Sequence, residues 1–508
     1  MWVALIILVV IAQIITETGF SQKLPDKMVY YTKASLYVKE YNVPTTDSDI
    51  RGIAVDNKGD VWFYQTNASS VARFIPSNGA FIQYATNSPL IAKQSVVNLA
   101  GGQITFDGNG NVWFTDARSN SIGKIERISG AVTMFPIPTE NSGPLGIIFD
   151  KNNHIWFTEI TGDKIGKLDL GSGIIEEYVL PENSGPALLT FDSNGMLWFT
   201  LAYAKKVAKL DPNSAVAGTS EGIQLYDLQG FYSPFGIAVL NNLLYISDHG
   251  SSKIAKFVPS SNSLTIYWTS PVQEIPVNEF PDTIPAQLLI DKESNIWFAE
   301  HVGNRIARLD PITNVITEYE IPSGPLSITL WLSIAPNGDV WFTEWASNNI
   351  GFVNTSIPVP FVVNLDRNII TLEAGTESEA NLFVTSASDN KLDLKFDLAG
   401  MTDLGITGLS YIFSPEKVTL EPKASTQSTI VLKGLQSLKS GTYTVMVKAS
   451  DGIISQLVPL TLVINQQESV KTPPSSGFPQ SVQLIAIVVL AVIGAFMLAY
   501  RLKSRRKN

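Results

Sequence analysis

The chain of 508 residues contains no cysteine and only three histidines, His154, His249 and His301. The lack of cysteine excludes disulfide bonds, zinc–thiolate sites and cysteine nucleophiles. Stability must therefore come from buried surface, which a chain of this length can supply. Imidazole catalysis is confined to the three histidines.

Charge is scarce too, and basic charge most of all. Charged residues make up 16% of the chain, and the formal net charge is −10. Five of the 36 basic residues stand in the last eight positions, which leaves 31 bases against 46 acids elsewhere. Phosphate binding needs a basic face, so we expect no nucleic-acid partner. The hydrophobic content of 45% favours a β-rich globular protein over a disordered one.

The N-terminus carries an apolar run of signal-peptide length over residues 2–15. Gly19 and Ser21 are small residues that suit cleavage after Ser21, which predicts a signal peptide over residues 1–21. No basic residue precedes the run, so an uncleaved anchor is the alternative.

The C-terminus has the pattern of a membrane anchor. Residues 482–500 are apolar over a length that crosses a bilayer. The basic tail, residues 501–508, follows directly and is expected in the cytoplasm. Residues 467–480 are rich in Pro and Ser and predict a linker. We therefore expect a single-pass cell-membrane protein whose bulk is extracellular and whose C-terminus is cytoplasmic.

A Trp-Phe phrase recurs at intervals of 42 to 52 residues. Its copies stand at Trp62, Trp113, Trp156, Trp198, Trp297 and Trp341, with Tyr245 in a degenerate copy. Each copy follows an apolar strand and a turn rich in Asp, Asn and Gly, and two further short strands come after it. Four short strands per repeat are typical of a propeller blade, so the sequence predicts an all-β, seven-bladed β-propeller over residues 36–354.

The two ends of the repeat region complement each other. The last repeat stops at Asn354 without an outer strand, whereas residues 35–44 have the outer-strand pattern and precede the first repeat. This segment can complete the last blade and close the ring, which removes exposed strand edges. Residues 357–466 then alternate short apolar runs with turns and predict an immunoglobulin-like β-sandwich.

The repeats carry a family resemblance. Residues 144–181 read PLGIIFDKNNHIWFTEITGDKIGKLDLGSGIIEEYVLP, and residues 297–322 read WFAEHVGNRIARLDPITNVITEYEIP. Such repeats resemble streptogramin B lyase (virginiamycin B lyase). The resemblance implies a propeller and, in true family members, a magnesium-assisted elimination that opens a cyclic depsipeptide at its ester.

The same resemblance implies a catalytic histidine after the Pro that opens an inner strand. The matching residues are Leu145, Ala187, Phe235 and Ala286, and none is a histidine. Without a base to take the proton, an elimination loses a factor of about 10²–10⁴. We therefore expect the family's scaffold with its chemistry removed or changed.

His249 and His301 are the weak catalytic candidates, because they are exceptions to the repeat. Each follows a carboxylate, Asp248 or Glu300, at the end of the second strand of neighbouring repeats. Neighbouring residues of a strand point to opposite faces, so one member of each pair is expected inside the blade. Phe235 and Trp345 are the candidate ligand-binding residues, with filling of the ring's mouth as the alternative.

A carboxylate recurs in most repeats three residues after the aromatic position. The set is Asp116, Glu159, Asp248, Glu300 and Glu344. The plain interpretation is a per-blade role, in which each accepts backbone N–H bonds or pairs with Lys or Arg. The alternative is a weak metal site, in which the ring of carboxylates binds magnesium or calcium through oxygen.

Three functions fit these patterns. The leading hypothesis is a membrane-anchored extracellular propeller that binds a small molecule or a surface protein without the family's catalytic histidines. The runner-up is a magnesium-dependent lyase or lactone hydrolase of a cyclic ester. The third is an architectural component of the cell envelope.

Overall fold

The computed structural model describes residues 34–465, apart from residues 87, 89–101, 272–281, 325–326, 374, 402–405, 407, 436 and 438. The predicted signal peptide, linker, membrane helix and basic tail lie outside the described residues. Within the described part of the chain, no helix combines the length and the apolar character needed to cross a bilayer.

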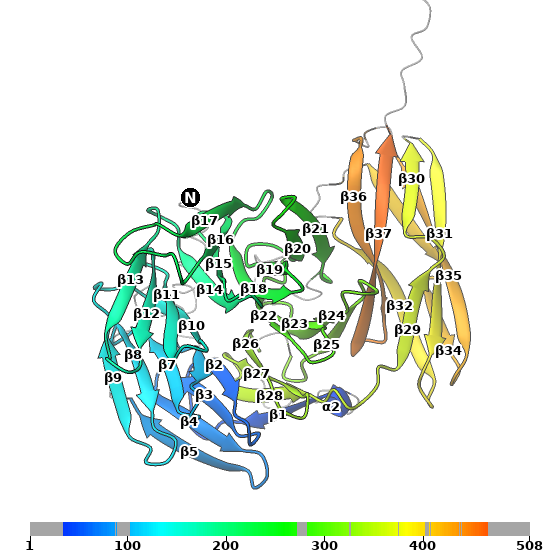
Figure 1. The fold of residues 1–508 in the computed structure, drawn as a ribbon. Helices are drawn as coiled ribbons and strands as arrows, with labels where there is room; N and C mark the ends of the chain where they lie inside the picture. Colours follow the sequence, from blue (N-terminus) through cyan, green and yellow to red (C-terminus); the bar gives the residue numbers. More distant parts are fainter. Residues whose placement is uncertain are drawn as a thin grey trace, which may run out of the picture. The chain divides into compact units, whose positions relative to one another are not determined.

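The first part of the chain folds into groups of four antiparallel strands (Figure 1). The first three groups are β2–β5 (Ile50–Val55, Val61–Gln65, Ser70–Ile75, Ala80–Ala85), β6–β9 (Ile104–Phe106, Val112–Asp116, Ser121–Ile125, Val132–Pro136) and β10–β13 (Pro144–Phe149, His154–Glu159, Lys164–Asp169, Ile175–Val179). The next three are β14–β17 (Pro186–Phe191, Leu197–Leu201, Lys206–Leu210, Ile223–Asp227), β18–β21 (Pro234–Leu240, Leu243–Asp248, Lys253–Val258, Ser263–Trp268) and β22–β25 (Pro285–Ile290, Ile296–Glu300, Arg305–Leu309, Ile316–Glu320). In the last group, β26–β28 (Thr329–Ile334, Val340–Glu344, Asn349–Val353), the fourth strand is β1 (Val38–Asn42), which follows the short helix α2 (Ala34–Tyr37).

The repeated turn explains why each group forms. In the third group, Asp150 Oδ1 accepts the backbone N–H of Asn152 at 2.8 Å and that of His154 at 2.9 Å. Its Oδ2 accepts the indole N–H of Trp156 at 2.9 Å. The same aspartate-to-tryptophan bond recurs in four other groups, so one side chain fixes the hairpin and satisfies the buried indole.

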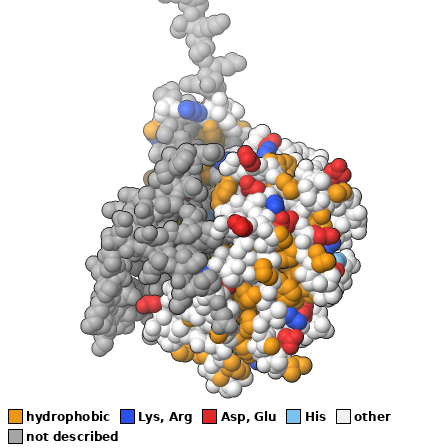
Figure 2. Space-filling view, turned by 90° about the vertical axis from the view of Figure 1, so that its left-hand side faces the viewer, with side chains coloured by type: hydrophobic (Ala, Val, Ile, Leu, Met, Phe, Trp, Pro, Cys, Tyr) orange, Lys and Arg blue, Asp and Glu red, His pale blue; other side chains and the backbone are white. Residues whose placement is uncertain are grey.

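The groups pack side by side through their inner strands, and β26 packs back against β2. The closing strand β1 pairs with β28 in antiparallel register from Val38↔Val353 to Asn42↔Asn349. The predictions of an all-β propeller and of a closing segment near residues 35–44 are therefore confirmed. Figure 2 shows acidic and basic side chains scattered among apolar ones where the described residues form the surface.

The second part of the chain forms two further sheets. Their strands are β29 (Phe361–Leu365), β30 (Ile369–Glu373), β31 (Glu377–Ser386), β32 (Leu392–Ala399), β33 (Leu409–Ser414), β34 (Lys417–Leu420), β35 (Ser425–Gly434), β36 (Gly441–Ser450) and β37 (Ile454–Asn465). One sheet has the order β29-β31-β35-β33, and the other contains β30, β37, β36, β32 and β34. Residues of β31 and β35 alternate between exposed and buried, which is typical of strands with one face on a core.

The two parts share a sheet, which the sequence did not predict. The first residues of β37 pair with the outer strand β25, from Ile316↔Leu457 to Tyr319↔Ile454. The outer edge of the β22–β25 group is therefore covered by a strand of the second part, and the combined sheet has nine strands. Such pairing protects an edge that would otherwise be open to aggregation.

Candidate functional site

The two unusual histidines lie side by side on one face of the ring. His249 follows β19 and His301 follows β23, in neighbouring groups. His249 Nε2 and His301 Nδ1 are 2.9 Å apart and share a hydrogen bond, and the two rings stack with centroids 5.1 Å apart. One imidazole must donate and the other accept, so at least one of them is neutral.

Further rings extend this pair in both directions. The Phe235 ring lies 4.9 Å from the His249 ring, and the Trp345 ring lies 6.5 Å from the His301 ring. The Arg51 guanidinium covers the Trp345 ring at 3.6 Å from its centroid. We call these five residues the ring platform. They come from four consecutive groups of strands, so the platform curves around part of the ring's mouth.

Arg51 is the member that the sequence reasoning missed. It is the second residue of β2 and occupies the same strand position as Phe235 in β18. Its Nε lies 2.9 Å from Asp49 Oδ1, which fixes the guanidinium over Trp345. An alignment of IRGIAV (50–55) with PFGIAV (234–239) would have found it.

Burial lowers the pKa of both platform histidines. The pKa of His249 falls to about 4, mainly through burial and against the opposing effect of Asp248. The pKa of His301 falls well below its ordinary value, through burial, His249 and Arg51. Both histidines are half-buried residues. At neutral pH the platform therefore offers neutral imidazoles beside aromatic rings.

The lowered pKa of His249 predicts acid sensitivity. The pKa of His249 is about 4 in the folded state and 6.5 in the unfolded state, so the folded state favours the neutral imidazole. The free energy of unfolding is therefore unaffected by this group above pH 6.5 and decreases as the pH falls from 6.5 toward 4. Between pH 7.5 and pH 5.0 the wild type should lose about 1–2 kcal/mol more unfolding free energy than His249→Gln. Urea denaturation of both proteins at the two pH values measures this difference. Equal losses would show that His249 does not carry the effect.

The five predicted carboxylates do not come together. Asp116 Oδ1 accepts the N–H groups of Arg118 and Ser119 at 3.0 and 3.3 Å. Asp248 accepts the N–H of Ser233 at 2.7 Å and the Nζ of Lys253 at 2.6 Å. Each of these aspartates bonds within its own group of strands and its loops, as the per-blade interpretation predicts.

Two of the three glutamates bond in the same way, whereas the buried Glu159 carboxyl has no hydrogen-bond partner among the described residues. Glu300 pairs with Arg305 at 2.8 Å, and Glu344 accepts the hydroxyl of Ser347 at 2.6 Å. Burial raises the pKa of Glu159, Glu300 and Glu344 to about 8 in each case. In the described part of the chain no three His, Asp or Glu residues form a group that could hold a metal ion.

The matched family positions also lack a base in the structure. Leu145, Ala187, Phe235 and Ala286 each follow the first residue of an inner strand, and all four are buried. In the last group the corresponding residue is Leu330. His154 lies at the start of β11, at the other end of the strands, and bonds to Asp150 at 2.9 Å.

The family model described as the virginiamycin B lyase family matches residues 36–325. The chain belongs to this family. No curated protein matches the sequence.

Solved structures agree with the assignment to the virginiamycin B lyase family. A structure of streptogramin B lyase is 30% identical, with a TM-score of 0.53, and the match covers 63% of this chain and 97% of that one. The virginiamycin B lyase of Staphylococcus aureus is 27% identical, with a TM-score of 0.52 and coverage of 62% and 98%. A catalytically inactive variant of that enzyme, in a structure with Quinupristin, gives the same values.

The residues at the platform do not fit the magnesium ion that the virginiamycin B lyase family implies. Magnesium prefers oxygen ligands in octahedral geometry. The side chains that converge here offer imidazole nitrogens, aromatic rings and one guanidinium, whereas Asp248 and Glu300 are turned into their own blades. The arrangement suits stacking and hydrogen bonding to a bound molecule.

Proposed function

We propose that the chain is a ligand-binding member of the virginiamycin B lyase family that has lost the family's elimination reaction. One observation carries the proposal. His249, His301 and Trp345 occupy the same position in three consecutive groups and form a stacked surface beside inner-strand positions that hold no imidazole. Binding needs such a surface, whereas elimination needs a base.

We also propose the finer architecture that the sequence predicts. The seven groups of strands act as a seven-bladed propeller, and residues 357–466 are an immunoglobulin-like module. The apolar segment 482–500 anchors the protein in the cell membrane, with the propeller outside the cell. The repeated order of strands and turns supports the propeller, and the basic tail after residue 500 supports the membrane orientation.

The ligand class follows from the platform's chemistry. Stacked aromatic rings favour a ligand with its own aromatic or other planar groups, and neutral imidazoles can donate or accept hydrogen bonds. Tyr203 and Tyr232, 42% and 63% exposed, lie in loops at the same end of the strands and offer further aromatic surface. A cyclic depsipeptide of the streptogramin B class carries suitable groups, and a relative's structure contains Quinupristin. We propose that the chain binds such molecules without opening them.

Titration of the full-length chain with quinupristin tests the proposal. Binding should appear in calorimetry as saturable heat and in thermal unfolding as an increase in Tm. Trp345→Ala and His301→Ala should each weaken binding by about tenfold or more, because each removes part of the stacked surface.

Ile160→Ala is the matched control. Ile160 has the position of His301 in the β10–β13 group, away from the platform, and its truncation should leave the affinity unchanged. A loss of affinity that is equal in all three variants would contradict the assignment of the site. If a high concentration of quinupristin leaves the Tm of the wild type unchanged, the result would favour the architectural role.

A further inference from the structure

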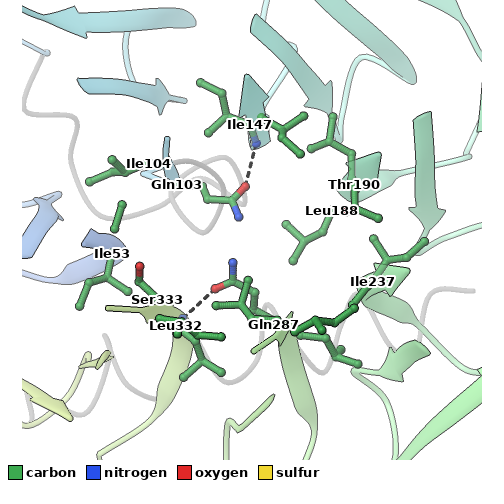
Figure 3. Close-up of a pocket in the computed structure, with 18 of the residues that line it drawn as sticks. Ile53, Gln103, Ile104, Ile147, Leu188, Thr190, Ile237, Gln287, Leu332 and Ser333 are labelled. Atoms are coloured by element: carbon green, nitrogen blue, oxygen red, sulfur yellow. Dashed lines mark hydrogen bonds between the residues drawn. The ribbon is translucent and has the colours of Figure 1, made fainter. Parts of the chain in front are cut away.

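The middle of the ring contains a cavity of about 420 Å³, separate from the ring platform. We call it the central channel. Its wall is built from the inner strands and is mostly aliphatic, with contributions from Ile53, Ile104, Ile147, Leu189, Ile237 and Leu332 (Figure 3). The buried rings of Phe235 and Trp331, 6.2 Å apart, join β18 to β26 on the platform side of this wall. None of the five platform residues is among the residues that line the channel.

Four polar side chains interrupt the aliphatic wall, namely the two glutamines Gln103 and Gln287 and the hydroxyl residues Thr190 and Ser333. Gln103 Oε1 accepts the backbone N–H of Ile147 at 2.7 Å, and Gln287 Oε1 accepts that of Leu332 at 2.7 Å. Each amide oxygen is thus fixed against the next inner strand. Figure 3 shows the two amide nitrogens pointing into the channel from opposite walls. Among the described residues, neither nitrogen has a hydrogen-bond acceptor.

Neighbouring groups can also pack without these side chains. Gly52, Gly146 and Gly236 occupy the same strand position in three other groups, where the backbone of the next group approaches closely. The glutamines take the place of that close approach. What they add to the channel is a pair of fixed N–H donors.

The lining determines the ligand's chemistry. The described residues of this lining include no Asp, Glu, Lys, Arg or His, so a charged ligand would lose its hydration without a countercharge from them. A neutral carbonyl oxygen can accept hydrogen bonds from amide donors at much lower cost. The cavity volume lies within the range of about 300–1,000 Å³ typical of small-molecule sites. We propose that the central channel binds a neutral small molecule whose carbonyl oxygen accepts hydrogen bonds from the Gln103 and Gln287 amides.

The test uses two probes of the same shape. Cyclohexanone carries a carbonyl oxygen, and methylenecyclohexane replaces it with a CH₂ group. With the full-length chain labelled with ¹⁵N-glutamine, cyclohexanone should shift the side-chain amide signals of Gln103 and Gln287, and methylenecyclohexane should bind at least about tenfold more weakly. This comparison is made on the wild type, so it does not depend on any variant folding.

Isosteric variants then assign the donors. Gln103→Glu and Gln287→Glu keep an oxygen for the neighbouring backbone N–H but lose the amide donors, so each should weaken cyclohexanone binding by about tenfold. Gln83→Glu on the outer strand β5 is the matched control and should bind as the wild type does. Equal binding of both probes would overturn the proposal in favour of an apolar cavity. No change in either amide signal would overturn it in favour of a channel that holds only water.

Discussion

Arg305→Met is expected to lower the free energy of unfolding by about 3–5 kcal/mol. Arg305 is 2% exposed and donates from Nε to Glu300 at 2.8 Å and from Nη2 to the carbonyl of Ser270 at 2.8 Å. Its Nη1 lies 3.8 Å from Glu318, which is fully buried. Methionine fills similar space but leaves the Ser270 carbonyl and the carboxylates of Glu300 and Glu318 without the guanidinium. Removing one member of a buried charged network lowers the free energy of unfolding far more than breaking an ion pair on the surface does.

Denaturation with guanidinium chloride measures the change in stability. The matched control is Lys206→Met, which removes a cation at the same strand position of the β14–β17 group, where the partner Asp227 is exposed. That variant should lose no more than about 1 kcal/mol. Arg305→Met combined with Glu318→Gln should recover part of the loss, since the carboxylate no longer needs a cation. If Arg305→Met and Lys206→Met lose similar unfolding free energy, burial does not strengthen the Arg305 network.

The same network marks what the sequence could not predict about the fold. Propeller strands were predictable because Trp156 and its equivalents recur with an aspartate six residues earlier, and each such pair fixes one hairpin. The pairing of β25 with β37 uses backbone hydrogen bonds, which leave no periodic signal in the side chains. Glu318 is buried beside Lys448 of β36, yet its segment ITEYE reads like any other outer strand.

The candidate site was predictable where it departs from the repeat. His249 and His301 were found because the other groups hold no histidine at their position, and the structure places the two imidazoles in contact. Asp116 and Asp248 of the recurring carboxylates accept backbone N–H groups of their own loops, a local role that repetition along the chain can indicate. Arg51 was missed because β2 does not begin with the Pro that opens β10, β14, β18 and β22.

The wild-type chain is expected to open the ester of quinupristin at least about 10²–10⁴-fold more slowly than the Staphylococcus aureus enzyme under the same conditions. The inner-strand positions that the family uses for its base hold Leu145, Ala187, Phe235 and Ala286. The two imidazoles nearby, His249 and His301, have pKa values lowered by burial, to about 4 for His249, which makes them weak bases at neutral pH.

Mass spectrometry of the linear product measures this rate, with magnesium present and with the Staphylococcus aureus enzyme as the positive control. A magnesium-dependent product that disappears in both His249→Ala and His301→Ala would establish the alternative, a lyase or hydrolase built on a new pair of imidazoles. Binding without product is the expected result, because the stacked surface survives while the proton acceptor is gone. The calorimetric and product measurements on one sample therefore separate a receptor from an enzyme.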